Sequence, residues 1–101
     1  MTEINENFWT KIEAEKTAIA GITQEAQSML GEITYVQLPE IGKSVKAGEE
    51  IGVIESLKAI YPIISPIDGE IFQVNAILEK KPELINESPD DKGWIWKMKI
   101  A

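Results

Sequence analysis

The spacing of apolar and polar residues predicts a chain built mainly of short β-strands. Several segments carry the β-branched and aromatic residues, or the alternation of period two, that is typical of strands. They are residues 8–12, 17–20, 33–38, 50–55, 59–63, 70–75 and 93–100. Between the first two segments lies the polar pair Glu15–Lys16, which predicts a hairpin turn.

Residues 23–31 instead have the pattern of one short helix. Thr23 is a good N-cap, Glu25 suits the first turn, and Gly31 provides a C-terminal stop. Apolar residues fall at helical spacing between them. A second polar stretch, residues 75–93, predicts one or two helical turns broken by prolines.

The last strand, "GWIWKMKI", alternates strictly. This pattern puts Trp94, Trp96 and Met98 on one face and the residues between them on the other. Aromatic residues at period two usually pack against a sheet, so we expect both tryptophans to lie in the core.

These elements predict a mostly β fold, a flattened antiparallel β-sandwich or barrel with one or two short helices. The length of 101 residues fits a single domain. We expect residues 1–7 to form a flexible N-terminus and residues 8–101 to form the domain.

Composition excludes several classes of function. The chain has no histidine and no cysteine, which removes histidine-based triads, thiolate metal sites and disulfides. Its net charge of −7 argues against a nucleic-acid partner. The acidic N-terminus does not resemble a signal peptide and no apolar run could span a bilayer, so we expect a cytoplasmic protein without a membrane partner. The acidic pairs Glu49–Glu50 and Asp90–Asp91 have the pattern of solvated loop charge.

One lysine has an unusual setting. Only about three residues join the predicted strands 50–55 and 59–63, so Ser56, Leu57 and Lys58 should form the tip of a tight hairpin. Lys58 is then either a solubilising turn residue or a modification site that is recognised by the shape of the tip.

The residues around Lys58 resemble the glycine cleavage H-protein family, a group of lipoyl-domain proteins. The family's modified lysine lies in an E-S-V-K-A tip followed by S-P-x-x-G-E, and this chain reads "ESLKA" at 55–59 and "SPIDGE" at 65–70. Further family motifs occur in order on both sides of the tip. They are "GITQEAQ" at 21–27, "GEITYVQLPEIG" at 31–42, "PELIN" at 82–86 and "GW" at 93–94.

The resemblance implies a covalent cofactor carrier, not an enzyme. Lys58 would bear lipoate as an amide, and Glu55, Ser56 and Ala59 would help the lipoylating enzyme recognise the tip. The arm would carry an aminomethyl group from the pyridoxal-phosphate-dependent glycine decarboxylase (P-protein) to the tetrahydrofolate-dependent aminomethyltransferase (T-protein). Dihydrolipoamide dehydrogenase would then reoxidise the arm. Either a lipoate ligase or a lipoyl/octanoyl transferase would attach it, and we expect the carrier to be a monomer.

The chain also departs from the family pattern. It ends at Ala101, where the family usually continues into a C-terminal helix, and Asn7-Phe8-Trp9 stands where many members have H-E-W. These departures leave open an H-protein-like lipoate carrier of another pathway, such as a lipoyl relay or sulfur metabolism. An unmodified interaction module is a further alternative. A biotin carrier fits less well, because that family's tip reads A-M-K-M.

Overall fold

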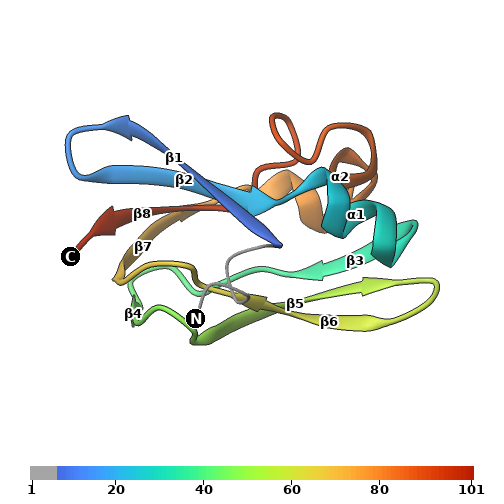
Figure 1. The fold of residues 1–101 in the computed structure, drawn as a ribbon, viewed down its shortest axis with the longest axis horizontal. Coiled ribbons are helices and arrows are strands. Elements are labelled where there is room, and N and C mark those ends of the chain that lie inside the picture. Colours follow the sequence, from blue (N-terminus) through green and yellow to red (C-terminus); the bar gives the residue numbers. More distant parts are fainter. Residues whose placement is uncertain (1–6) are drawn as a thin grey trace.

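The computed structural model describes residues 7–101, which form two antiparallel β-sheets packed as a sandwich (Figure 1). The strands are β1 (Phe8–Ala14), β2 (Thr17–Ile22), β3 (Ile33–Gln37), β4 (Ser44–Val45), β5 (Glu50–Ser56), β6 (Ile60–Ile64), β7 (Gly69–Val74) and β8 (Trp96–Ile100). The helices are α1 (Gln24–Leu30), the 3-10 helix η2 (Ala76–Glu79) and α2 (Glu83–Glu87). The predicted mostly β sandwich with short helices is confirmed.

One sheet has the strand order β1-β2-β8-β7-β4, and the other has the order β3-β5-β6. Apolar side chains from both sheets form the core between them, with Trp96 and Ile54 fully buried. Phe8 contacts both sheets. The centroid of its ring lies 6.2 Å from the ring centroid of Tyr61 on β6 and 6.3 Å from that of Trp96 on β8. Burial of this apolar surface is the main force that holds the two sheets together.

The β1–β2 hairpin forms as expected. Its turn is Glu15–Lys16, and Lys16 adopts a positive φ of 60°. Of the N-terminal segment 1–7, residues 1–6 lie outside the described part of the chain. Asn7 donates a hydrogen bond from Nδ2 to the hydroxyl of Tyr61 (2.6 Å), and its carbonyl accepts one from the N–H of Thr23 (3.0 Å).

Helix α1 has the ends that the sequence predicts. The hydroxyl of Thr23 accepts a hydrogen bond from the N–H of Ala26, and Gly31 ends the helix with a φ of 80°. Ala26 and Leu30 face the core, whereas Met29 is exposed. Within residues 7–101 no helix is long and apolar enough to cross a membrane.

The segment 75–93 contains the expected helical turns, η2 and α2. Pro82 separates the two helices, as expected. It lies at the N-cap of α2, where a proline is well tolerated because its missing N–H would have no helical partner. Ile85 anchors α2 in the core.

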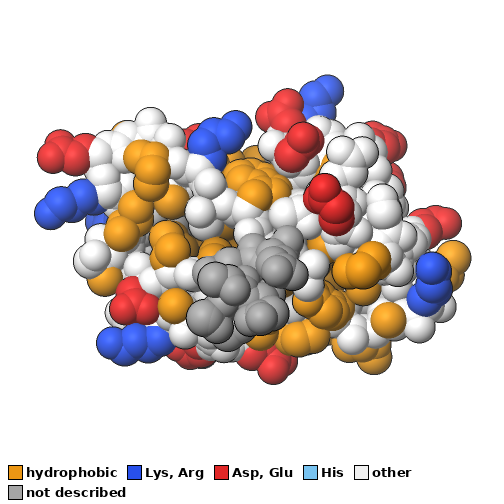
Figure 2. All heavy atoms as spheres, in the orientation of Figure 1, with side chains coloured by type: hydrophobic (Ala, Val, Ile, Leu, Met, Phe, Trp, Pro, Cys, Tyr) orange, Lys and Arg blue, Asp and Glu red, His pale blue; other side chains and the backbone are white. Residues whose placement is uncertain are grey.

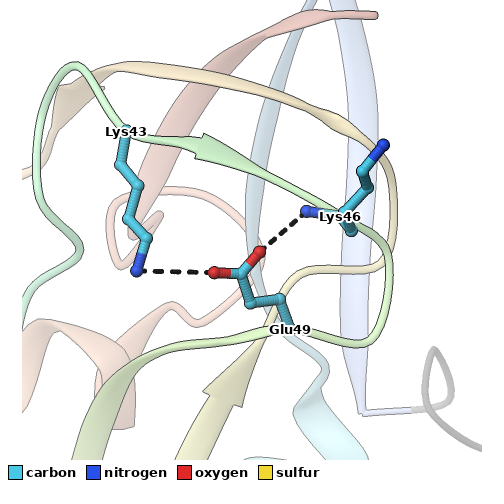
Figure 3. Close-up of polar contacts among 3 residues, drawn as sticks. All are labelled: Lys43, Lys46 and Glu49. Atoms are coloured by element: carbon cyan, nitrogen blue, oxygen red, sulfur yellow. Dashed lines mark hydrogen bonds and ion pairs between the residues drawn. The ribbon is translucent and has the colours of Figure 1, made fainter.

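The segment between β3 and β5, in which the sequence indicates no strand, contains the short strand β4, whose Ser44 pairs with Glu70 of β7. Glu49 holds the turn that follows (Figure 3). One carboxylate oxygen accepts a hydrogen bond from the N–H of Lys46 (3.0 Å), and the other lies 3.4 Å from Nζ of Lys43.

Two details differ from the expected strand patterns. A register irregularity between Ile33 and Tyr35 interrupts the alternation in β3, so that Ile33 and Val36 are both buried. The prediction that Trp94 shares the core face of Trp96 is wrong. β8 begins only at Trp96, Ile95 takes a fully buried position, and Trp94 is half-buried with Nζ of Lys97 5.1 Å from its ring centroid.

Candidate functional site

The β5–β6 hairpin ends in a short loop that carries Lys58. Glu55 pairs with Ile60 across the hairpin, and the N–H of Ser56 donates to the carbonyl of Ala59 at 2.8 Å. The loop is therefore residues 57–59, and β5 runs one residue further than expected, through Ser56. The prediction that Lys58 lies at an exposed hairpin tip is confirmed.

The hydroxyl of Ser56 organises the backbone of this loop. Its oxygen accepts hydrogen bonds from the N–H groups of Lys58 (3.2 Å) and Ala59 (3.1 Å), and its O–H donates to the carbonyl of Ala59 (3.3 Å). A serine side chain can satisfy nearby backbone donors in this way because its oxygen has two lone pairs. The backbone at Lys58 is thus fixed by its own strand.

The tip also rests on the segment between α1 and β3 (Figure 1). The N–H of Leu57 donates to the carbonyl of Glu32 at 3.2 Å, so all three loop N–H groups are hydrogen-bonded. The stem of Lys58 lies against Gly31, where an added Cβ would be 3.1 Å from Cε of the lysine. These contacts fix the tip against the body of the domain while the lysine side chain stays exposed.

Exposed apolar side chains lie on the hairpin that carries the lysine and on the neighbouring strand β3. Leu57 and Ile60 are 75% and 72% exposed, and Tyr35 lies in register with Glu55, which in turn pairs with Ile60. Cross-strand partners point to the same face of a sheet, so Tyr35, Glu55 and Ile60 form a row beside the tip. Figure 2 shows hydrophobic side chains next to a basic one at this end of the molecule. Exposed apolar groups of this kind are typical of a surface that contacts other proteins.

Other candidate chemistry is weaker. Within residues 7–101, no group of three or more acidic side chains is arranged to hold a metal ion. Of the acidic pairs, Glu49 has the structural role described above, and the N–H of Lys46 and then the ammonium of Lys43 lower its pKa. An open hollow of about 370 Å³ is lined by residues 44–46, 68–70 and 99–101, none of which belongs to the tip.

The structure brings Glu55, Ser56, Lys58 and Ala59 together in one turn, as the sequence predicts. No sequence pattern indicates that Gly31 and Glu32 support the tip. Gly31 could be recognised only as a helix stop, and Glu32 acts through its backbone carbonyl, which every residue type possesses.

Comparison with known proteins identifies the family. The family model for the glycine cleavage H-protein matches residues 1–101. The chain belongs to the glycine cleavage H-protein family. An H-protein is a lipoyl carrier and not an enzyme, which confirms the class of function that the motifs predicted.

Individual H-proteins are similar over most of the chain. The glycine cleavage system H protein of Teredinibacter turnerae is 47% identical over 96 residues, which are 95% of this chain and 74% of that protein. The H protein of Opitutus terrae is 50% identical over 93 residues, covering 92% of this chain and 73% of that protein. The crystal structure of an H protein from Mycobacterium marinum superimposes with a TM-score of 0.89 at 33% identity, covering 95% of this chain and 80% of that one.

Proposed function

We propose that Lys58 is the lipoyl attachment residue of this H-protein and that the chain carries the aminomethyl group within the glycine cleavage system. The observation that carries the proposal is a lysine with an exposed side chain on a loop whose three N–H groups are all hydrogen-bonded. A modifying enzyme that recognises shape needs a fixed backbone and a free amine, and the tip offers both.

The residues at the tip fit a lipoyl amide. Lysine supplies a primary amine on a flexible stem, whereas arginine stays protonated and is a poor acyl acceptor. When bound, a lipoyl group supplies the redox-active sulfurs that the chain itself lacks, because it contains no cysteine. Glu55, Ser56 and Ala59 define the shape of the turn and are proposed as the recognition residues for a lipoate ligase or a lipoyl/octanoyl transferase.

The proposed partners are glycine decarboxylase, aminomethyltransferase and dihydrolipoamide dehydrogenase, in the cytoplasm. A tethered arm makes transfer between such enzymes effectively intramolecular wherever the carrier docks. Leu57, Ile60 and Tyr35 supply exposed apolar surface beside Lys58 for this docking. The net charge of −7 favours partners with basic surfaces around their active sites.

The test compares Lys58→Arg with Lys80→Arg, which alters an exposed lysine outside the tip. Each variant is co-expressed with a lipoate ligase and lipoate, digested, and examined by mass spectrometry. We expect lipoate on Lys58 in the wild type and in Lys80→Arg, and no lipoylation of Lys58→Arg although its circular dichroism is unchanged. A lipoyl group on another lysine, or an unmodified wild type beside a modified reference H-protein, would contradict the proposal.

Lipoylated protein is then tested with glycine decarboxylase and aminomethyltransferase. We expect turnover by the wild type and by Lys80→Arg, and none by Lys58→Arg. A lipoylated chain that supports no turnover with these enzymes would assign the carrier to another lipoate-dependent pathway.

A further inference from the structure

Asn86 is the last residue of the "PELIN" motif, and its side chain contacts the segment that supports the tip. Its Oδ1 accepts a hydrogen bond from the N–H of Ile33 at 2.8 Å, and its Nδ2 donates to the carbonyl of Ile33 at 3.2 Å. One side-chain amide thus satisfies both backbone groups of one residue. The two residues are 53 positions apart in the sequence.

This arrangement replaces a missing neighbouring strand. β3 is an edge strand of the three-stranded sheet, and its first residue, Ile33, pairs with Ser56 of β5 on one side only. Because the residue Ile33, backbone included, is only 2% exposed, its backbone groups on the open side would be poorly placed to find water. An amide offers one donor and one acceptor, as a strand does, so Asn86 completes the edge of the sheet.

Gln27 on α1 extends the same cluster. Its Nε2 donates to the carbonyl of Gly31 at 3.2 Å and to Oδ1 of Asn86 at 3.2 Å. Asn86 and Gln27 together therefore hold residues 31 and 33, on either side of Glu32. The carbonyl of Glu32 accepts the hydrogen bond from Leu57, and Gly31 supports the stem of Lys58.

We propose that Asn86 is a positioning residue for the Lys58 tip, an inference that rests on the proposed function of Lys58. Asn86 fixes Ile33 and Glu32, Ile33 is in register with Ser56, and the hydroxyl of Ser56 holds the backbone of Lys58. The amide does not touch the lysine. It sets the place and angle at which the tip is presented to an acylating enzyme.

The first test measures hydrogen exchange of the Leu57 N–H by NMR in the unmodified chain. In Asn86→Ala we expect this N–H to exchange roughly tenfold faster, after correction for the change in global stability, because its acceptor is no longer held in place. The matched control is Asn75→Ala. Asn75 also donates from its side chain to two backbone carbonyls, those of Lys92 (3.1 Å) and Trp94 (2.8 Å), but not to the tip segment.

Unchanged corrected exchange of Leu57 in Asn86→Ala would overturn the proposal, and so would an equal increase in Asn75→Ala. If Asn86→Ala does not fold, Asn86→Asp is used in its place. This variant keeps the acceptor for Ile33 and loses the donor, so we expect faster exchange of Leu57 there as well.

The second test measures acylation of Lys58 by a lipoate ligase with lipoate and ATP. If only a fraction of Asn86→Ala molecules present the tip correctly, the KM for the carrier rises roughly tenfold while kcat stays within about twofold. An unchanged KM would refute the positioning role. A wild type that is not acylated at Lys58 would refute the proposed function instead, and the exchange of Leu57 would still decide whether Asn86 positions the tip.

Discussion

The stem of Lys58 lies directly over Gly31, the residue that ends α1. An added Cβ on Gly31 would be 3.1 Å from Cε of the lysine and 3.9 Å from Nζ. Gly31 adopts a φ of 80° and a ψ of −153°, a conformation that is essentially restricted to glycine. One glycine therefore serves two purposes: it ends the helix, and it leaves room for the Lys58 side chain.

Substitution of this glycine separates the two purposes. We expect Gly31→Ala to lower the free energy of unfolding by about 1–3 kcal/mol, because its backbone conformation is strained for alanine. The new methyl group should also displace the Lys58 stem, which is detected as a change in the ¹³C shift of Lys58 Cε. Gly42→Ala is the matched control, since Gly42 has a φ of 94° but an added Cβ there meets nothing within 4 Å. A Lys58 shift that moves equally in both variants would contradict the contact.

Ser56→Ala tests the hydroxyl that holds the tip. The N–H groups of Lys58 and Ala59 lose their acceptor but can turn to water, so the free energy of unfolding should fall by only about 0.5–1.5 kcal/mol. Acylation of Lys58 should slow more than this small loss suggests, because the turn is no longer fixed. Ser28→Ala, at an exposed position in α1, should leave acylation unchanged. Equal acylation rates for the wild type and Ser56→Ala would show that the hydroxyl is dispensable.

The two tryptophans near the C-terminus should differ sharply. Trp96 is fully buried and its Nε1 lies 3.4 Å from Sδ of Met98, so Trp96→Ala should lower the free energy of unfolding by about 3–5 kcal/mol. Trp94 is half-buried and contacts Lys97, so Trp94→Ala should cost about 1–2 kcal/mol. Urea denaturation followed by circular dichroism measures both values. Similar losses would mean that Trp94 belongs to the core after all.

The turn at Glu49 predicts a specific pH dependence. Hydrogen bonding by the N–H of Lys46, and then the ammonium of Lys43, lower the pKa of Glu49 in the folded chain. A lowered pKa stabilises the fold at neutral pH, and this contribution is lost as the pH falls below about 4.3, the usual pKa of an unfolded glutamate, and through the folded value. Glu49→Gln should flatten the decline of the melting temperature between about pH 5 and 3. An identical decline in both proteins would show that other carboxylates dominate.

Much of the fold was predictable because its signals are local. Thr23 and Gly31 delimit a helix by cap chemistry that needs no tertiary contact. The irregularity between Ile33 and Tyr35 had no such signal, since it depends on how β3 meets β5. Strand β4 leaves no sequence signal, because a two-residue strand is too short to show a period. Trp94 does not follow the alternation because it lies two residues before the start of β8.

The site likewise combines features with a local sequence signal and features that depend on tertiary contacts. The turn around Lys58 is encoded by neighbours within three residues, chiefly the hydroxyl of Ser56. Its supports are distant in sequence or act through the backbone. Asn86 reaches Ile33 across 53 positions, and Glu32 contributes only a carbonyl. The spacing of apolar and polar residues therefore predicts neither contact.

The position of β8 in the larger sheet affects the folding rate of the chain. This strand lies between β2 and β7, which are far apart in the sequence, and pairs with both. The β1–β2 hairpin can close early from local contacts, yet it joins the rest of that sheet only when β8 arrives. Such dependence on non-local pairing predicts folding in milliseconds to seconds, at the slow end for small domains. The fluorescence of Trp96, which becomes buried in that step, would report the slow event directly.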